Sequence, residues 1–423
     1  MFLNIPLHPG FVAQRQSTMA VGPRKSRVLG AILMLIFISL LVVVSRKMGQ
    51  HKHSVQKPYI PSTRFWRWWK WSESFWNREQ QQLDLIYNPI LNVAPTNDSL
   101  VARMPWWLNH PQALKRCEPD RRVPRQVEDY NTLPQRFQDF LLYMHCRAYP
   151  ILINQPHLCD DRPFLLLAIK SLAPHFDRRQ AIRQSWGQAG SVANRTVVTV
   201  FLLGIASPAD NFPDLSGMLS HEAKRHRDLL QWEYRDSFFN LTLKETHFLE
   251  WFGQHCSHAH YILKGDDDVF VNTWQIIRYL EHLPEVMTKD LFVGDVIRNA
   301  SPHRDHRLKY FIPESVFVGD YPPYAGGGGY LYSGPLALRL YKVSQQVALF
   351  PIDDVFTGMC LKKMGLVPEE HKGFKTFDVD KKYRENPCAY KNLMLVHSRT
   401  PQEMIQIWSW LADPNLDCQN STR

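Results

Sequence analysis

Short apolar runs alternate with segments of helical spacing in the middle of the chain. The runs are rich in branched and aromatic residues, which is typical of buried strands; they are 164–169, 196–203 and 261–264. The helical segments are 177–186, a polar stretch near 215–230, and 241–255. This alternation predicts an α/β fold with a mostly parallel sheet and helices on both faces. Ligands of such folds bind at the carboxyl ends of the strands.

A different pattern opens the chain. Residues 28–44 are 17 apolar or small residues without a charge, and as a helix they would span about 26 Å. Basic residues flank the run on both sides, so charge alone does not fix its orientation. No small-x-small cleavage site follows it, which favours an uncleaved signal-anchor over a secretory signal peptide.

The anchor divides the chain into five expected parts. They are a cytosolic tail (1–27), the transmembrane signal-anchor (28–44), a lumenal stem (45–88), an N-terminal extension packed on the catalytic domain (89–163) and that domain itself (164–423). The Trp-rich stretch 66–71 fits either an interfacial segment or a stem packed on the body, and both readings stay open.

Glycosylation sequons indicate which side of the membrane the body occupies. All five follow the anchor, at Asn97, Asn194, Asn240, Asn299 and Asn420. Together with the anchor they favour a lumenal body. The seven cysteines also follow the anchor and form no CxxC pair. This suits disulfides in an oxidising lumen, with at least one thiol free or bonded to another chain.

The net charge of +10 is concentrated at the N-terminus. Residues 1–78 hold 12 of the 50 Lys and Arg and one of the 40 acidic residues, so 38 bases face 39 acids in residues 79–423. A body that is nearly neutral gives no support to a nucleic-acid-binding function.

Three consecutive carboxylates, Asp266, Asp267 and Asp268, follow the strand 261–264. Confining them beside a hydrophobic core is unfavourable unless a cation or hydrogen-bond donors compensate their charge. A hard divalent ion that also binds a phosphorylated ligand would do so. The alternative is an acidic turn that caps the next helix.

Four further features accompany the triplet. Arg178, Arg179 and Arg183 begin a helix and either pair with phosphates or form a solvated face. The glycine-rich stretch 324–330 is no phosphate-binding P-loop, and it forms either a shaped pocket wall or a flexible loop.

The other two features lie near the C-terminus. Asp353 and Asp354 precede an apolar helix, where N-capping is the alternative to a chemical role. His397 ends an apolar strand and either completes a metal site or is a packed residue.

Seven motifs, in this order, resemble those of the inverting β-1,3-glycosyltransferases of the Fringe-like type, and among these the β-1,3-N-acetylglucosaminyltransferases. They are FLLLAIKS (164–171), RRQAIRQSWG (178–187), KGDDDVFVN (264–272), GDV (294–296), YAGGGGYLYSG (324–334), DDVFTGMCL (353–361) and VHSR (396–399). The resemblance runs from about residue 75 to 418. Residues 1–18 fall outside the resemblance, so either Met1 or Met19 is the residue at which translation starts.

The resemblance implies a GT-A (Rossmann-like) catalytic domain and a role for each motif residue. Asp354 would be the catalytic base, and Asp268 and His397 would hold Mn²⁺, with Mg²⁺ as the alternative. The donor would contact Asp266, Asp267, Lys264, Arg183 and Arg179. The pocket for acceptor and donor would include Asp353, Tyr324, Gly327 and Gly328.

The resemblance also implies the substrates and the location. UDP-GlcNAc would donate GlcNAc to O3 of a terminal galactose on N-acetyllactosamine glycans of glycoproteins or glycolipids, in a single inverting displacement. The expected location is the Golgi membrane, single-pass type II, as a monomer or as a homo- or heterodimer with other glycosyltransferases. A sister β-1,3-galactosyltransferase and a non-catalytic lumenal sugar-binding protein are the alternatives.

Overall fold

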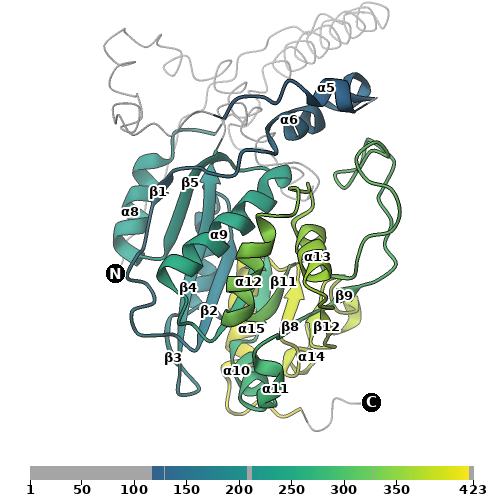
Figure 1. Ribbon diagram of the computed structural model, residues 1–423. Helices are drawn as coiled ribbons and strands as arrows, with labels where there is room; N and C mark the ends of the chain where they lie inside the picture. The colour runs from purple at the N-terminus through teal and green to yellow at the C-terminus, as the bar shows by residue number, and fades with distance from the viewer. Residues whose placement is uncertain (1–116, 128, 207–211, 327, 419–423) are drawn as a thin grey trace, which may run out of the picture. The chain divides into compact units, whose positions relative to one another are not determined.

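The computed structural model describes residues 117–127, 129–206, 212–326 and 328–418, all within one of the two compact units of the chain (Figure 1). The predicted tail, anchor and stem lie outside these residues, as do Asn97, Asn420 and Gly327. Within the described part, none of the helices has the length and apolar character needed to cross a bilayer.

A nine-stranded mixed sheet forms the centre of the described unit. Its order is β1 (Ile151–Ile153), β5 (Leu229–Arg235), β4 (Arg195–Ile205), β2 (Leu165–Lys170), β6 (Tyr261–Asp266), β11 (Gly329–Ser333), β8 (Phe292–Gly294) and β12 (Glu369–Glu370), with β3 (Gly190–Val192) on β4. The central strands β5, β4, β2 and β6 are parallel, while β1, β3 and β11 pair antiparallel with their neighbours. The carboxyl ends of the four parallel strands therefore share one edge.

Helices cover both faces of this sheet (Figure 1). One face packs against α9 (Leu241–His255), α12 (Gly334–Ser344) and α13 (Asp353–Lys363), and the other against α7 (Phe176–Gln184), α8 (Ser216–His226), α10 (Thr273–Glu281) and α15 (Pro401–Ala412). The central strand β2 is almost entirely apolar because both faces of the sheet are buried there: Leu166 faces the first helix layer and Leu167 the second.

The remaining helices are short or peripheral. They are α5 (Val123–Gln126), η4 (Tyr130–Thr132), α6 (Gln135–Tyr143), η6 (Phe238–Asn240), α11 (Glu285–Thr288), η7 (Lys381–Tyr383) and α14 (Pro387–Tyr390).

Two smaller sheets complete the fold. A three-stranded sheet joins β13 (Phe374–Lys375), β14 (Leu395–His397) and β7 (Val269–Val271). A two-stranded sheet joins β9 (Val296–Ile297) and β10 (Tyr324–Ala325), which are connected by a long loop. In the first of these, His397 pairs in register with Val269, directly after the acidic triplet.

The predicted strands and helices match β2, β4, β6, α7 and α9, and the prediction of an α/β fold with helices on both faces is confirmed. Strand β5 was missed. Polar residues alternate with apolar ones along it, and the sequence analysis assigned its first residues to the helix before it. α8 ends at His226, and Arg227 after it has a left-handed backbone.

Residues before the predicted domain boundary at 164 contribute to the same core. Phe137, Phe140 and Leu141 of α6 are buried in the layer that contains α9, and β1 extends the sheet beyond β5. The sheet thus begins N-terminal to the predicted start of the catalytic domain.

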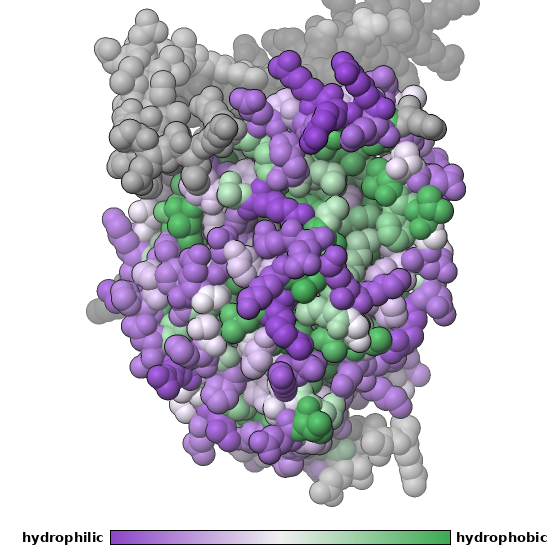
Figure 2. All heavy atoms as spheres, viewed as in Figure 1, coloured by the Kyte–Doolittle hydropathy of each residue, from purple (hydrophilic) through white to green (hydrophobic). Residues whose placement is uncertain are grey.

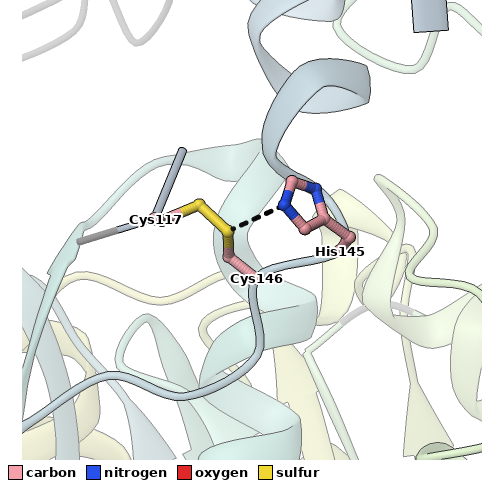
Figure 3. A group of neighbouring side chains, drawn as sticks. All are labelled: Cys117, His145 and Cys146. Carbon is pink, nitrogen blue, oxygen red and sulfur yellow. Dashed lines mark hydrogen bonds between the residues drawn. A yellow bond between two sulfur atoms is a disulfide. The ribbon is translucent and has the colours of Figure 1, made fainter. Parts of the chain in front are cut away.

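Six of the seven cysteines form disulfides: Cys117–Cys146, Cys159–Cys256 and Cys388–Cys418. Cys360 is the odd, free thiol that the sequence predicted, and it is buried. Figure 3 shows His145 beside the first disulfide, with its Nε2 3.5 Å from Cys146 Sγ. This trio is the one group of three potential metal ligands among the described residues. Its two sulfurs are bonded to each other, so it offers no thiolate to a metal.

Candidate active site

The acidic triplet lies where β6 ends, at the edge shared by the parallel strands. Asp266 is the last residue of β6, and the turn through Asp267 and Asp268 leads into β7. The sequence places the triplet here because the buried strand before it and the apolar Val269–Val271 after it both enter the core. The three side chains then point to three different sets of partners.

Asp267 is buried, and both of its carboxylate oxygens have hydrogen-bonding partners. It accepts hydrogen bonds from Ser171 Oγ (2.6 Å) and Arg178 Nη1 (2.9 Å), and its Oδ2 lies 2.7 Å from His175 Nδ1. Burial would raise the pKa of Asp267, but His175 and Arg178 outweigh it and hold the pKa below its usual range. Asp267 therefore fixes the turn through these partners, and its contact with the donor stays a prediction.

Asp268 and His397 form the second set. Asp268 Oδ1 lies 3.7 Å from His397 Nε2, and Asp268 Oδ2 lies 3.8 Å from Arg178 Nη1. Burial and the neighbouring charge of Asp266 raise the pKa of Asp268. Both side chains are about one-third exposed, so a ligand can reach them.

The pair fits a divalent cation. Two ligand atoms, each about 2.1 Å from one ion, lie about 3 to 4 Å apart, which includes the observed separation of 3.7 Å. His397 Nδ1 is 3.1 Å from Thr376 O. At this distance the N–H of Nδ1 can donate a hydrogen bond to the carbonyl of Thr376, which leaves Nε2 without a proton and available to bind a metal. One carboxylate and one imidazole leave further positions for phosphate oxygens and water.

Glycines bring a loop close to this pair. Gly328 has φ +95°, and a Cβ there would lie 2.8 Å from Val269 Cγ1 and 2.9 Å from His397 Cβ. Its carbonyl accepts a hydrogen bond from the backbone N–H of Asp266. Gly328 therefore packs directly against the pair, and the role of the glycine-rich stretch as a pocket wall stays a prediction.

Asp266 belongs to the third set, together with the first turn of α13. Lys170, at the end of β2, lies 2.9 Å from Asp266 Oδ1 and 2.7 Å from Asp353 Oδ2. Burial would lower the pKa of Lys170, but Asp266, Asp353 and Asp354 outweigh it and raise the pKa well above its usual value. This buried cation joins two acidic motifs that lie far apart in the sequence.

Asp354 follows in the same turn and is half-buried. Tyr324 of β10 lies near it: burial first, and then the charge of Asp354, raise the pKa of Tyr324 to about 12. The two acidic residues at the start of α13 also face the positive end of the helix dipole. The fold thus brings Asp353, Asp354 and Tyr324 close to Lys170 and Asp266, and their role in a pocket for acceptor and donor stays a prediction.

Three residues that the sequence predicts to contact the donor have partners inside the fold. Lys264 is 1% exposed and pairs with Glu245 of α9 inside the first helix layer. Arg179 is fully buried and pairs with Glu222. Arg183 pairs with Glu222 and Asp228. Each of these side chains thus has an acidic partner within the fold, and its contact with a donor stays a prediction.

Sequence reasoning missed two contributors. Lys170 was included in a motif but given no role, although a lysine that ends a buried strand is a signal for a partner at the strand edge. Arg178 was considered beside Arg179 and Arg183, yet it alone of the three reaches the triplet. The roles predicted for Asp268, His397, Asp353 and Asp354 stay predictions, on residues that the fold brings together.

The fold defines an α/β protein with a cluster of carboxylates at the carboxyl ends of its parallel strands. Residues 177–372 match the family described as Galactosyltransferase. The N-acetyllactosaminide β-1,3-N-acetylglucosaminyltransferases 2 of Mus musculus and Homo sapiens are 56% and 55% identical over 401 residues, covering 95% of this chain and all of theirs. The chain belongs to the β-1,3-N-acetylglucosaminyltransferase family of glycosyltransferases.

More distant relatives have related names. The human acetylgalactosaminyl-O-glycosyl-glycoprotein β-1,3-N-acetylglucosaminyltransferase is 43% identical over 304 residues, which is 70% of this chain and 79% of the relative. Among solved structures, the WbbM bifunctional glycosyltransferase covers 59% of this chain and 50% of its own, at 11% identity and a TM-score of 0.31. That likeness is too low to define the fold more closely.

Proposed function

We propose that this protein transfers N-acetylglucosamine from UDP-GlcNAc to O3 of the terminal galactose of N-acetyllactosamine glycans, with inversion at the anomeric carbon. Relatives that bear the name of this activity match 95% of the chain, which supports the donor and the acceptor. The single observation that carries the proposal is the cluster at the strand ends. There, Lys170 joins Asp266 to Asp353, directly before Asp354.

The proposed reaction is one displacement. The galactose O3 forms a bond to C1 of GlcNAc, the bond from C1 to the phosphate oxygen breaks with its electrons moving to UDP, and the proton of O3 passes to Asp354. Asp354 can accept this proton because it is half-buried and still reachable. Lys170 keeps the carboxylates of Asp266 and Asp353 in fixed positions beside it.

Asp268 and His397 would hold a divalent cation, Mn²⁺ or Mg²⁺, which when bound neutralises charge on the departing diphosphate. The fixed orientation of His397 supports this assignment. We also propose that the domain has the GT-A fold. The position of the acidic motif at the carboxyl end of a parallel strand supports this assignment.

The proposed location is the Golgi membrane, with one signal-anchor at 28–44 and the catalytic body in the lumen. The apolar run and the sequons after it support this topology. Three disulfides in the described residues suit an oxidising compartment.

Product analysis tests the function. The purified protein is incubated with Mn²⁺, lactosamine acceptors and a panel of UDP-sugars, and the linkage of the product is determined. We expect UDP-GlcNAc to be consumed and a β-1,3 linkage to galactose to form. Consumption of UDP-galactose instead would identify a sister galactosyltransferase, and no consumption of any donor would favour a sugar-binding protein.

A further inference from the structure

A pocket lies beside the carboxyl end of β5, and none of the residues of the acidic motifs is in its lining. It has a volume of about 560 Å³ and is enclosed by α6, by the junction of η6 and α9, and by the loop between β9 and β10. Six aromatic side chains contribute to its lining: Phe140, Tyr143, Tyr149, Tyr234, Phe238 and Phe239. Asp139, Asn240 and Lys309 add polar groups. Pockets of this size and mixed lining accept small amphipathic ligands.

The loop wall of this pocket has apolar residues at the surface. Leu308 and Tyr310 are 43% and 41% exposed. Figure 2 shows hydrophobic residues at the surface in the upper right of the view, where Figure 1 draws α13 and this loop. Arg136 of α6 holds the loop by donating to the carbonyls of His306 and Leu308, at 3.0 and 3.2 Å.

Asn240, which lines the pocket, is also the acceptor of the sequon Asn240-Leu241-Thr242. Its Nδ2 donates a hydrogen bond of 2.8 Å to Arg235 O. A glycosylated asparagine keeps one amide N–H, so this bond can persist while the second hydrogen is replaced by a sugar. Attachment at Asn240 therefore places the first sugar beside the pocket without rearranging the backbone.

The lining suits that first sugar, N-acetylglucosamine. A pyranose ring has an apolar C–H face that packs on aromatic rings, and its hydroxyl and acetamide groups need polar partners. Phe238, two residues before Asn240, is held in place by Tyr310 in an edge-to-face contact at 5.3 Å and by Lys309 at 5.3 Å. Tyr143, on the opposite wall, is 40% exposed and offers a second ring.

We infer that the proximal N-acetylglucosamine of a glycan on Asn240 occupies this pocket and ties α6 to the loop between β9 and β10. The other described sequons do not share the arrangement, because Asn194 and Asn299 are exposed and lie outside the pocket lining. The inference rests on the proposed lumenal orientation and is independent of the transfer reaction. The inner sugars of a bound acceptor glycan are the competing occupant.

Selective trimming tests the inference on the folded protein. A full-length chain whose only remaining sequon is Asn240 is prepared with a high-mannose glycan. One sample is cut by an endoglycosidase that leaves a single N-acetylglucosamine, and a second is cut by an amidase that leaves a bare side chain. We expect the intact and singly glycosylated forms to share one Tm and the bare form to melt at least about 3 °C lower.

Two controls separate pocket binding from general effects of glycans. A chain whose only sequon is Asn299 should keep its Tm under both treatments. In the Asn240-only chain, Phe238→Ala should remove the difference between the singly glycosylated and bare forms. The never-glycosylated variant Asn240→Gln should melt with the bare form, which excludes an effect of the aspartate that the amidase creates.

Three results would overturn the inference: no change of Tm in the bare form, a singly glycosylated form that melts as low as the bare one, or an unmodified Asn240 in the wild-type protein. Glycopeptide analysis distinguishes the causes of the last result. Glycans at Asn194 and Asn299 with none at Asn240 reject the pocket alone, whereas no glycan at any of the three also rejects the lumenal orientation. Binding of lactosamine oligomers that Phe238→Ala abolishes would assign the pocket to the acceptor instead.

Discussion

At the scale of single residues, three adjacent aspartates acquire different environments. Asp267 is buried among hydrogen-bond donors, Asp268 faces His397, and Asp266 pairs with Lys170. The sequence predicts where these carboxylates lie because a buried strand ends at them. It does not predict their partners, since Lys170 and Asp353 are 183 residues apart and only the fold brings them together.

Asp354 gives the sharpest test of the proposed chemistry. Asp354→Asn keeps the shape of the side chain but cannot accept a proton, so we expect the transfer rate to fall by about 10²- to 10⁴-fold while UDP affinity stays within about twofold. Transfer rates and UDP calorimetry measure the two effects. Asp160→Asn, an exposed aspartate distant in sequence from the acidic motifs, is the matched control and should change neither. Near-normal turnover by Asp354→Asn would remove Asp354 as the base.

At the scale of elements, buried ion pairs join helices that the sequence analysis could not associate. Arg179 and Arg183 of α7 pair with Glu222 of α8, 43 residues from Arg179, whereas the sequence analysis considered only phosphates or a solvated face for them. Strand β5 was missed although polar and apolar residues alternate along it, because the sequence analysis extended the preceding helical segment to about residue 230.

Glu222 provides a prediction about pH. Burial would raise the pKa of Glu222, but Arg179 and Arg183 outweigh it and lower the pKa below its usual value of 4.5. A carboxyl whose pKa is lower in the folded state contributes stability above about pH 4.5, and this stability is lost as the pH falls through the folded-state pKa. Glu222→Gln should therefore reduce the free energy of unfolding by about 3 kcal/mol at pH 7.

As the pH falls below about 4.5 and then through the lower folded-state pKa of Glu222, the wild type and the variant should converge, because the wild-type carboxyl also becomes protonated. Urea unfolding at pH 7 and at a series of lower pH values measures both differences. The control is Glu281→Gln, which breaks the partly exposed pair with Arg195 and should change the free energy by less than about 1 kcal/mol. A difference for Glu222→Gln that does not depend on pH would contradict the ion-pair explanation.

The glycine-rich wall makes a second prediction at this scale. Gly328→Ala would place a Cβ against Val269 and His397 at a backbone angle that alanine avoids. We expect it to displace His397 and weaken Mn²⁺ binding by about 10- to 100-fold, measured by calorimetry. Gly217→Ala in α8 is the control, because its Cβ would meet no atom within 4 Å. Unchanged Mn²⁺ affinity in Gly328→Ala would separate the loop from the metal site.

At the scale of the described unit, one disulfide encloses most of the parallel sheet. Cys159 precedes β2 and Cys256 follows α9, a separation of 97 residues that includes β2, β4 and β5. Cys388–Cys418 closes only 30 residues near the C-terminus. The paired cysteines could not be assigned from the sequence, because six residues allow many pairings and only the fold brings the correct ones together.

These loop lengths lead to different expected contributions. Cross-linking lowers the entropy of the unfolded chain, by about 4.7 kcal/mol for a loop near 97 residues and about 3.6 kcal/mol for one near 30. Replacing Cys159 and Cys256 together by alanine should thus cost about 1 kcal/mol more than replacing Cys388 and Cys418, as measured by urea unfolding of both double variants. Cys159 and Cys256 are also buried in the core, so a difference in unfolding free energy larger than about 1 kcal/mol would include lost packing as well as the loop effect. If replacing Cys159 and Cys256 instead lowers the unfolding free energy less than replacing Cys388 and Cys418, the unfolded chain keeps this part of the sheet ordered without the cross-link.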